Sequence, residues 1–282
     1  SNASINEPTI APNIYHHSFV NKKNMNYEVK LNAHEIKDDE GYDIQRWSGN
    51  AQIEKIMQSR DYELKFNGET GLDLYAINDR PSSDQNDNKY LERLSLGFAL
   101  TASKETIRNY QQSNLFLKPT IQFASIYSTD RKEDIPNRDS SDFRLDSSNL
   151  FFVNQFQGRD NIQTNHRINY GLNSVVISNE YGDIDFFLGQ SQRVGGTENN
   201  TLISNPNRTS NIINNISWNL SENTNISWDS LYDNETLKTN YSNITLNSKI
   251  FGIDFSTSHS SLDGTLVNDN EDREEYIISL SK

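Results

Sequence analysis

The chain has 282 residues, of which 33% are hydrophobic and 10% aromatic, and it carries a formal net charge of −13 and no cysteine. A surface that neutralises phosphates needs clustered Lys and Arg, so this charge argues against a nucleic-acid-binding protein. The lack of cysteine excludes disulfides, thiolate zinc sites and cysteine nucleophiles within this sequence. Thirteen Tyr, 13 Phe and 3 Trp argue against a disordered chain and, together with many turn-forming residues, favour strands over helices.

The two ends of the sequence suggest a segment of a longer protein. Residues 1–3, Ser-Asn-Ala, resemble what remains after an expression tag is removed, and the last residues stop inside an alternating pattern. Residues 4–282 show no break in composition, so we expect one domain. No stretch reaches the roughly 18 continuous apolar residues of a transmembrane helix. Two classes remain, a soluble all-β protein and a membrane-spanning β-barrel, whose signal is weak in each strand.

In the first half of the chain, apolar and polar residues alternate with the period of two that is typical of strands. This pattern predicts strands over residues 26–36 and 91–103, where Leu94, Leu96, Phe98 and Leu100 share one face. Residues 62–79 are expected to form two strands around the Gly-Glu-Thr-Gly sequence at 68–71. Residues 115–128 are expected to form a pair of short strands around Pro119.

Two other stretches in this half have a different character. Residues 78–90 are polar and contain Pro and Asn, so they predict a loop. Residues 50–63 fit either a helix, because Ile53, Ile56 and Met57 are three and four positions apart, or a strand with a bulge. Both alternatives stay open from the sequence.

From residue 165 onward, the alternation is regular. Residues 215–220 and 225–230 repeat an Ile-Ser-Trp triplet around Ser-Glu-Asn-Thr, which predicts a hairpin. Further strands are expected over residues 168–178, 182–190, 243–249, 250–258 and 275–282. The whole chain therefore predicts about 12 to 16 antiparallel strands in an all-β, up-and-down meander that forms all or part of a transmembrane β-barrel.

No constellation of residues suits catalysis. The closest match to a Gly-x-Ser-x-Gly nucleophile elbow is residues 189–193, where Arg193 replaces the second glycine and no helix is expected to follow. Asp183 and Asp185 share a strand face that is most simply the hydrated one. We therefore expect no catalytic residues and no enzyme activity.

Ligands for a metal or a cofactor are also not apparent. The acidic stretches that begin at Asp84 and Asn268 lack the Gly and Glu positions of an EF-hand loop, so they suit solvated loops. The five histidines contain no His-Glu-x-x-His pair, and no glycine-rich phosphate loop occurs. We expect no metal site and no cofactor.

Residues 135–161 and the strands that follow resemble the C-terminal barrel domain of the LptD family, also called the organic solvent tolerance protein family, of lipopolysaccharide-assembly outer-membrane proteins. The resemblance covers about residues 40–195. It is carried by short elements in the order Pro-Asn-x-Asp-Ser, Asp, Asn-Leu-Phe, Phe-x-Gly-x-Asp, Arg-x-Asn-Tyr-Gly-Leu and Gly-Gln-Ser. The matching residues are Pro136, Asn137, Asp139, Ser140, Asp146, Asn149, Leu150, Phe151, Phe156, Gly158, Asp160, Arg167, Asn169, Tyr170, Gly171, Leu172, Gly189, Gln190 and Ser191.

The resemblance implies transport of lipopolysaccharide into the outer leaflet of a Gram-negative outer membrane, without covalent chemistry. It also implies the family's partners, a plug formed by an LptE-type lipoprotein and periplasmic bridge proteins. A barrel interior is polar, so we expect residues 135–161 to fold inward and pack against it, while Leu150, Phe151 and Phe152 anchor the strand that follows. The alternative is an ordinary long loop followed by a strand. The motif residues are thus expected to have structural roles in packing the lumen or the loop.

The main alternative is a soluble all-β surface module that binds glycans through exposed Trp and Tyr. It is favoured by the short apolar patterns, because several predicted strands offer only three outward apolar positions, whereas a bilayer-spanning strand needs about 9–11 residues. Solubility without detergent would distinguish this module from a barrel.

Overall fold

The computed structural model describes residues 9–37, 43–78, 89–129, 135, 144–155, 158, 160, 162, 164–178, 180–196, 208–264 and 271–281. They form one antiparallel sheet of 14 strands. The strands are β1 (Thr9–Lys22), β2 (Met25–Lys37), β3 (Asp43–Ser59), β4 (Tyr62–Asn78), β5 (Lys89–Lys104), β6 (Thr106–Asn109), β7 (Ser113–Ser128), β8 (Asn165–Ser178), β9 (Asp183–Gly196), β10 (Ile212–Ser221), β11 (Thr224–Tyr232), β12 (Thr239–Ile250), β13 (Ile253–Leu262) and β14 (Arg273–Ser281).

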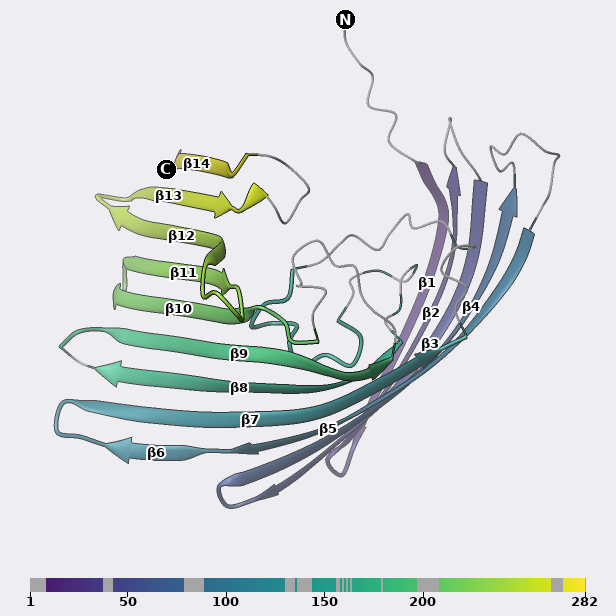
Figure 1. The fold of residues 1–282 in the computed structure, drawn as a ribbon, viewed down its shortest axis with the longest axis horizontal. Coiled ribbons are helices and arrows are strands. Elements are labelled where there is room, and N and C mark those ends of the chain that lie inside the picture. Colours follow the sequence, from purple (N-terminus) through teal and green to yellow (C-terminus); the bar gives the residue numbers. More distant parts are fainter. Residues whose placement is uncertain are drawn as a thin grey trace, which may run out of the picture.

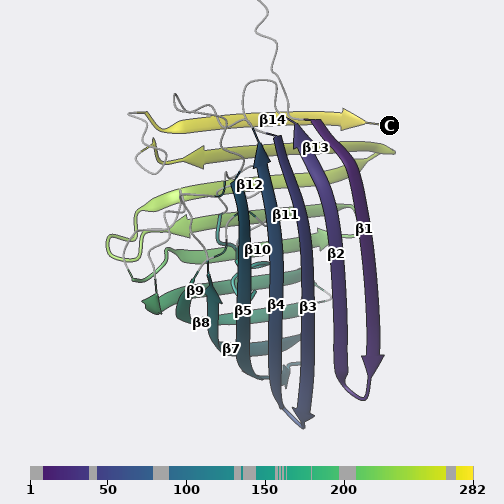
Figure 2. The same cartoon turned by 90° about the vertical axis from the view of Figure 1, so that its right-hand side faces the viewer.

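Each strand pairs with its neighbour in sequence, except that β7 pairs with both β5 and the short β6. The all-β meander and the expected number of strands are therefore confirmed. The sheet is strongly curved (Figure 1), and β1–β5 run steeply across the direction of β8–β14 (Figure 2). It does not close among the described residues, so β1 and β14 are its two edges. No helix in the described part of the chain is long and apolar enough to cross a membrane.

The structure resolves the ambiguity at residues 50–63 in favour of strands. β3 continues to Ser59 and pairs with β4 without a break in register, and Arg60 adopts a positive φ of 46° in the turn between them. The turn predicted at residues 68–71 is wrong, because β4 runs straight through it. A Cβ atom on Gly71 would lie 2.6 Å from Oγ of Ser95, so this glycine allows close packing of adjacent strands instead of a turn.

Pro119 does not separate two short strands, and that prediction is also wrong. β7 continues through it, with Pro119 opposite Leu172 of β8. On the other side of β7, β5 pairs as far as Ser103 and β6 begins at Thr106, so Pro119 lies beside the gap between them. A residue without an N–H group is tolerated there, because the neighbouring strand is interrupted.

The two faces of the sheet are inverted relative to a water-soluble protein. On β5, the outward Leu96 and Leu100 are 51% and 50% exposed, whereas the inward Arg93 and Ala99 are fully buried. The same alternation continues on the neighbouring strands, where Leu72 and Phe123 are exposed and Asp73 and Gln122 are buried. Apolar residues thus cover the convex outer face and polar residues the concave inner face, as in membrane β-barrels.

The apolar core is split into small clusters on the inner face. They are Ile36, Ile44, Tyr75, Ile77 and Ile135; Leu150, Phe187, Ile213 and Leu231; and Ala99, Ala124 and Val153. Each cluster includes one residue from the long connection between β7 and β8. That connection therefore supplies the inner side of the core.

The connections between strands alternate in length around the sheet. At one end of the strands, which we call the short-connection edge, they are short: residues 23–24, 60–61, 110–112, 179–182, 222–223 and 251–252. Those at the opposite edge are longer: residues 38–42, 79–88, 129–164, 197–211, 233–238 and 263–272. Short turns on one side and longer loops on the other are typical of outer-membrane barrels.

Leu96→Arg tests the inverted faces. If Leu96 contacts lipid near the bilayer midplane, the arginine should lower the free energy of unfolding by about 2–4 kcal/mol in phospholipid bilayers. Leu96→Phe is the control and should change it little. Reversible urea unfolding of the full-length protein in vesicles measures both, and equal stability of the two variants would contradict a lipid-facing position.

Candidate functional site

The candidate site is the inner segment, defined as the described residues 144–155, 158, 160, 162 and 164, with the strand residues that it contacts. It begins with a tight turn that Asp146 and Asn149 close reciprocally. The Asp146 carboxylate accepts hydrogen bonds from the backbone N–H groups of Ser148 at 2.8 Å and Asn149 at 3.2 Å. The Asn149 side chain accepts from the Asp146 N–H at 2.9 Å and donates to the Arg144 carbonyl at 2.8 Å. Asx-type turns of this kind hold the backbone locally.

This turn presents two apolar side chains to the sheet. Leu150 is fully buried among Phe187, Ile213 and Leu231, and Phe151 packs edge-on against Phe187, with ring centroids 6.4 Å apart. A Cβ atom on Gly189 would lie 2.6 Å from Cδ2 of Leu150. Gly189 therefore leaves the space that Leu150 fills.

Arg167 of β8 holds the next part of the inner segment. Its side chain is almost fully buried, and its guanidinium donates to the carbonyls of Phe152 and Val153 and, at 3.0 Å, to Oδ1 of Asn165. A buried guanidinium needs such acceptors, because burial of an unpaired charge is costly. The backbone of the inner segment supplies them.

A chain of buried amide and hydroxyl groups joins the same region to four strands, β5, β7, β8 and β9. Gln122 donates to the carbonyl of Phe151 at 2.8 Å and to Oγ1 of Thr101 at 2.9 Å. Its own amide oxygen accepts from Asn169 at 2.7 Å, and Asn169 accepts from Oγ of Ser191 at 2.6 Å. These four strands are therefore connected to the inner segment through polar contacts on the inner face.

The end of the inner segment is held by Asp160. Its carboxylate forms an ion pair with Arg46 of β3 at 2.6 Å, and its carbonyl accepts from Arg93 of β5 at 2.8 Å. Arg93 also pairs with Asp73 at 2.7 Å and donates to the Tyr75 hydroxyl at 2.9 Å. All of these side chains are buried. Asp160 thus links the segment to three adjacent strands, β3, β4 and β5.

The motif residues predicted from the sequence fall into three groups. Asp146, Asn149, Leu150, Phe151, Asp160, Arg167 and Gly189 come together on the inner face, where Gly171 lies opposite Gly189. Gly158 adopts a positive φ of 89° in the segment. Tyr170 and Gln190 instead pair with each other on the outer face, by a hydrogen bond of 2.5 Å. Residues 136, 137, 139, 140 and 156 lie outside the described residues.

Sequence reasoning missed the strand residues that receive the segment: Arg46, Asp73, Tyr75, Arg93 and Gln122. A signal for them was present in the alternation. Once Leu94 and Leu96 are assigned to the lipid-facing side, Arg93 must face the interior. A charged residue whose position alternates with outward leucines such as Leu94 and Leu96 marks an inner position that requires a partner.

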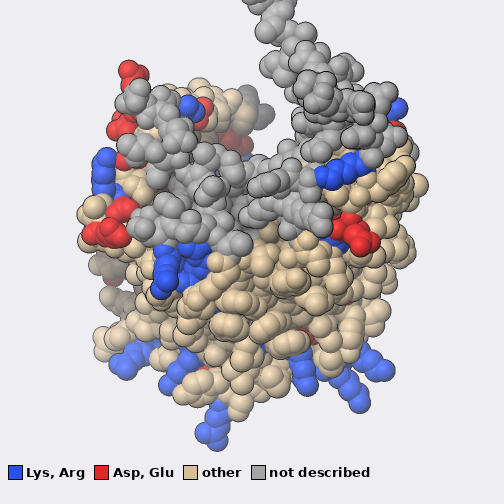
Figure 3. Space-filling view, turned by 45° about the vertical axis from the view of Figure 1, so that its right-hand side comes forward, with Lys and Arg blue, Asp and Glu red and all other residues tan. Residues whose placement is uncertain are grey.

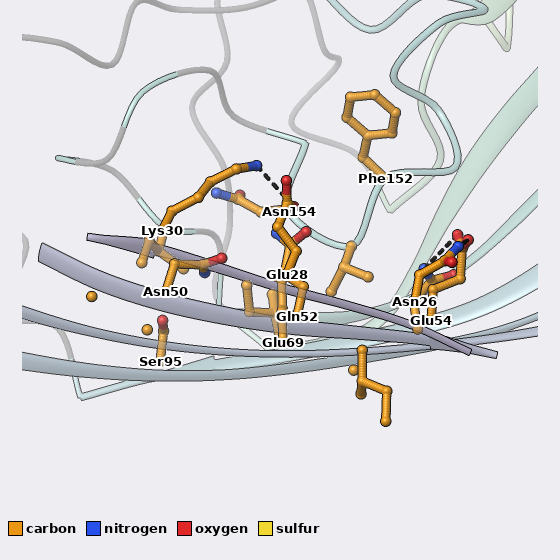
Figure 4. A pocket seen from close by; sticks show the side chains of 18 of the residues that line it. Asn26, Glu28, Lys30, Asn50, Gln52, Glu54, Glu69, Ser95, Phe152 and Asn154 are labelled. Atoms are coloured by element: carbon orange, nitrogen blue, oxygen red, sulfur yellow. Dashed lines mark hydrogen bonds and ion pairs between the residues drawn. The ribbon is translucent and has the colours of Figure 1, made fainter. Parts of the chain in front are cut away.

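Between the inner segment and β1–β5 lies a cavity of about 630 Å³ (Figure 4). Its walls are mainly polar, with Glu28 paired to Lys30 at 2.9 Å and Glu54 accepting from Asn26 at 2.9 Å. Glu69 also lines it. Among the described residues, no group of three His, Cys, Asp or Glu side chains could hold a metal ion. With these carboxylate, ammonium and amide groups in its walls, the cavity can form polar contacts with a bound molecule.

A double-mutant cycle tests the ion pair between Arg46 and Asp160. Arg46→Gln and Asp160→Asn should each destabilise the protein, and the double variant should recover a coupling energy of about 1–3 kcal/mol in the free energy of unfolding. The control cycle combines Asp160→Asn with Glu63→Gln, which lies apart from the pair. We expect additivity there, and additivity in both cycles would contradict direct coupling.

Gly189→Ala tests the packing of Leu150. The added methyl group has no space beside Leu150 and Phe187, so we expect a loss of about 1–3 kcal/mol in the free energy of unfolding. It should also increase protease cleavage within the inner segment. Gly49→Ala is the matched control, because its Cβ would meet Leu31 at an ordinary 3.4 Å. Equal stability of both variants would mean that Leu150 is not held at Gly189.

Comparison with known proteins adds independent information. A search among curated proteins finds no match to the chain. The family model for LptD, described as LPS transport system D, matches residues 3–276. Because this match covers nearly the whole chain, the chain belongs to the LptD family of lipopolysaccharide transport proteins.

Proposed function

We propose that the chain is part of an outer-membrane translocon that assembles lipopolysaccharide into the outer leaflet, without covalent chemistry. The observation that carries this proposal is the family match over residues 3–276. The inverted faces of the sheet support it, because lipid can solvate exposed Leu96 and Leu100 whereas water cannot do so favourably.

The inner face suits a polar passage. Strands β10–β13 turn Asn, Ser and Thr side chains inward, including Asn225, Ser227, Asn243 and Thr245. Hydroxyl and amide groups can form hydrogen bonds with sugars and hydrated phosphates. A lipid whose head group moves along this face could keep its acyl chains in the apolar phase.

The edge strands matter for release of the lipid. Within the described sheet, β1 and β14 each pair on one side only, and their unpaired backbone groups cannot be left in hydrocarbon. We propose that further strands complete a barrel here and that lipid leaves sideways through a seam between paired strands. An LptE-type lipoprotein in the interior and periplasmic bridge proteins at one end would be its partners.

The inner segment has a structural role in this proposal. It belongs to the edge with the longer connections, which in outer-membrane barrels faces the cell exterior. From there, it reaches the inner face and contacts β3, β7 and β8 through Asp160, Gln122 and Arg167. It would narrow the interior and hold the curvature of the wall around the passage.

A soluble glycan-binding module is less consistent with these observations. Such a module would have to expose large apolar side chains on many neighbouring strands, and contiguous apolar patches of that extent are rare on soluble monomers.

Depletion of the full-length protein tests the function. Loss of the protein should reduce the lipopolysaccharide that a membrane-impermeant reagent labels at the cell surface, and the wild-type gene should restore it. The Arg167→Gln variant should restore labelling only in part, because two backbone carbonyls of the inner segment lose their donor. Lys118→Gln is the control, with an unchanged fold and full restoration expected.

Migration on gels is a second measurement in the same experiment. The wild-type protein should partition into detergent and migrate differently before and after boiling. A fully soluble monomer, or normal surface labelling after depletion, would contradict the proposal.

A further inference from the structure

Charged residues near the short-connection edge of β1–β7 are sorted by face. Four cations point outward: Lys22 on β1, Lys55 on β3, Lys104 on β5 and Arg108 on β6. For Lys22 and Lys55 the direction follows from the pairing register, in which Lys22 lies opposite Met25, Met25 opposite Lys55, and Lys55 opposite the exposed Phe66. Lys104 shares the face of the exposed Leu100 on β5. Arg108 lies opposite Leu115, which shares the face of the exposed Ile121 on β7. We call these four residues the basic collar. Each is exposed, and none forms an ion pair within the described residues.

The acidic residues of the same strand ends point the other way. Glu28, Glu54 and Glu63 face inward, where they pair with Lys30 at 2.9 Å, Lys65 at 3.3 Å and Lys118 at 3.4 Å. Asp61 and Glu105 lie in the connections themselves, beyond the strand faces. The outward positions at this end of β1–β6 therefore carry positive charge only.

The residue types that follow one another on the outer face, from the short-connection edge inward, match those of a membrane interface. At the edge, Nζ of Lys104 lies 5.2 Å from the ring centroid of Tyr62, which is 57% exposed. Leu64 and Phe66 are the next two residues of β4 on the same face as Tyr62. The exposed apolar side chains of the outer face continue beyond them. Tyr and Lys are favoured where hydrocarbon meets the head groups, because each has an apolar body and a polar tip.

The collar forms a row and does not converge on one point. Lys22 and Lys55 are in register two strands apart, at a distance of about 10 Å. Lys104 lies about 13 Å further along β5 than Leu100, the residue in line with Lys55. A single small ligand could not contact all of them. Figure 3 shows Lys and Arg side chains spread along the lower rim beneath a broad, mainly uncharged surface. This arrangement suits a layer of anionic head groups.

We propose that the basic collar binds the phosphate groups of anionic phospholipids in the leaflet that surrounds the short-connection edge. This inference rests on the proposed membrane placement of the sheet. The cations attract phosphates, the Tyr62 ring fixes the depth of the interface, and the inward carboxylates keep negative charge away from the lipid. The collar would thus set the vertical position of the wall in the membrane.

The test uses full-length protein in detergent micelles, with phosphatidylglycerol and phosphatidylcholine as probes and native mass spectrometry as the measurement. For the double variant Lys55→Gln/Lys104→Gln, binding of phosphatidylglycerol should weaken at least about five-fold, since each cation near an anionic surface contributes on this scale. Phosphatidylcholine binding should change little. Inorganic phosphate at the same concentration should not compete, which distinguishes a lipid head group from free phosphate.

The matched control is Lys65→Gln/Lys118→Gln, which removes the same charge from the inner face of the same region. It should leave phosphatidylglycerol binding unchanged. Equal weakening in both double variants, or none in the collar variant, would overturn the proposal.

Heat-modifiable migration on gels shows whether each protein folds as a membrane barrel. If the collar variant keeps this migration, its lipid binding tests the collar alone. Absence of this migration in the wild-type protein would instead contradict the membrane placement. If the collar double variant does not fold, Lys104→Gln and Lys104→Arg replace it. Weaker binding is expected with glutamine and full binding with arginine, and equal binding by these two would also overturn the proposal.

Discussion

The burial of three arginines on the inner face is the constraint on which the rest of the structure depends. Arg46, Arg93 and Arg167 are at most 4% exposed, and a guanidinium, which has five N–H donors and a full charge, needs acceptors when it is buried. Strand side chains provide some of these acceptors, including Asp73 for Arg93. The backbone carbonyls of the inner segment and the Asp160 carboxylate provide others. The segment and the wall therefore stabilise each other, since neither satisfies its buried polar groups alone.

This mutual dependence also explains the small size of the apolar clusters. A barrel wall places most of its apolar side chains on the outer face, so few of them face the interior. Leu150 and Val153 enter where Gly189 and Gly97 leave space, and polar contacts flank each entry point. The fixed geometry of hydrogen bonds compensates for the limited apolar area, because it determines where the segment lies.

Most of the fold could be predicted from alternation alone, because the side-chain period of a strand directly reports its faces. The errors occurred at Gly68–Gly71 and Pro119, where local turn propensity suggested a break. In the structure, Gly71 and Pro119 meet conditions set by neighbouring strands, a close contact with Ser95 and the gap between β5 and β6. Such conditions depend on pairing register and cannot be read from one strand. For the same reason, the motif around Asp146 and Leu150 could be identified and alternation could place Arg93 on the inner face, but neither Arg46 nor Arg93, far away in sequence, could be paired with Asp160.

The distribution of charge follows from the same two-faced wall. An acidic chain with a net charge of −13 would be repelled by anionic head groups if its carboxylates were distributed at random over the outer face. At the short-connection edge, Glu28, Glu54 and Glu63 are instead turned inward and paired, and the outward positions carry lysine and arginine. The net charge of the chain is thus a poor guide to the charge that the membrane encounters. The charge that faces the membrane depends on whether each charged residue occupies an outward or an inward position of its strand. A shift of the strand by one residue would exchange the two faces.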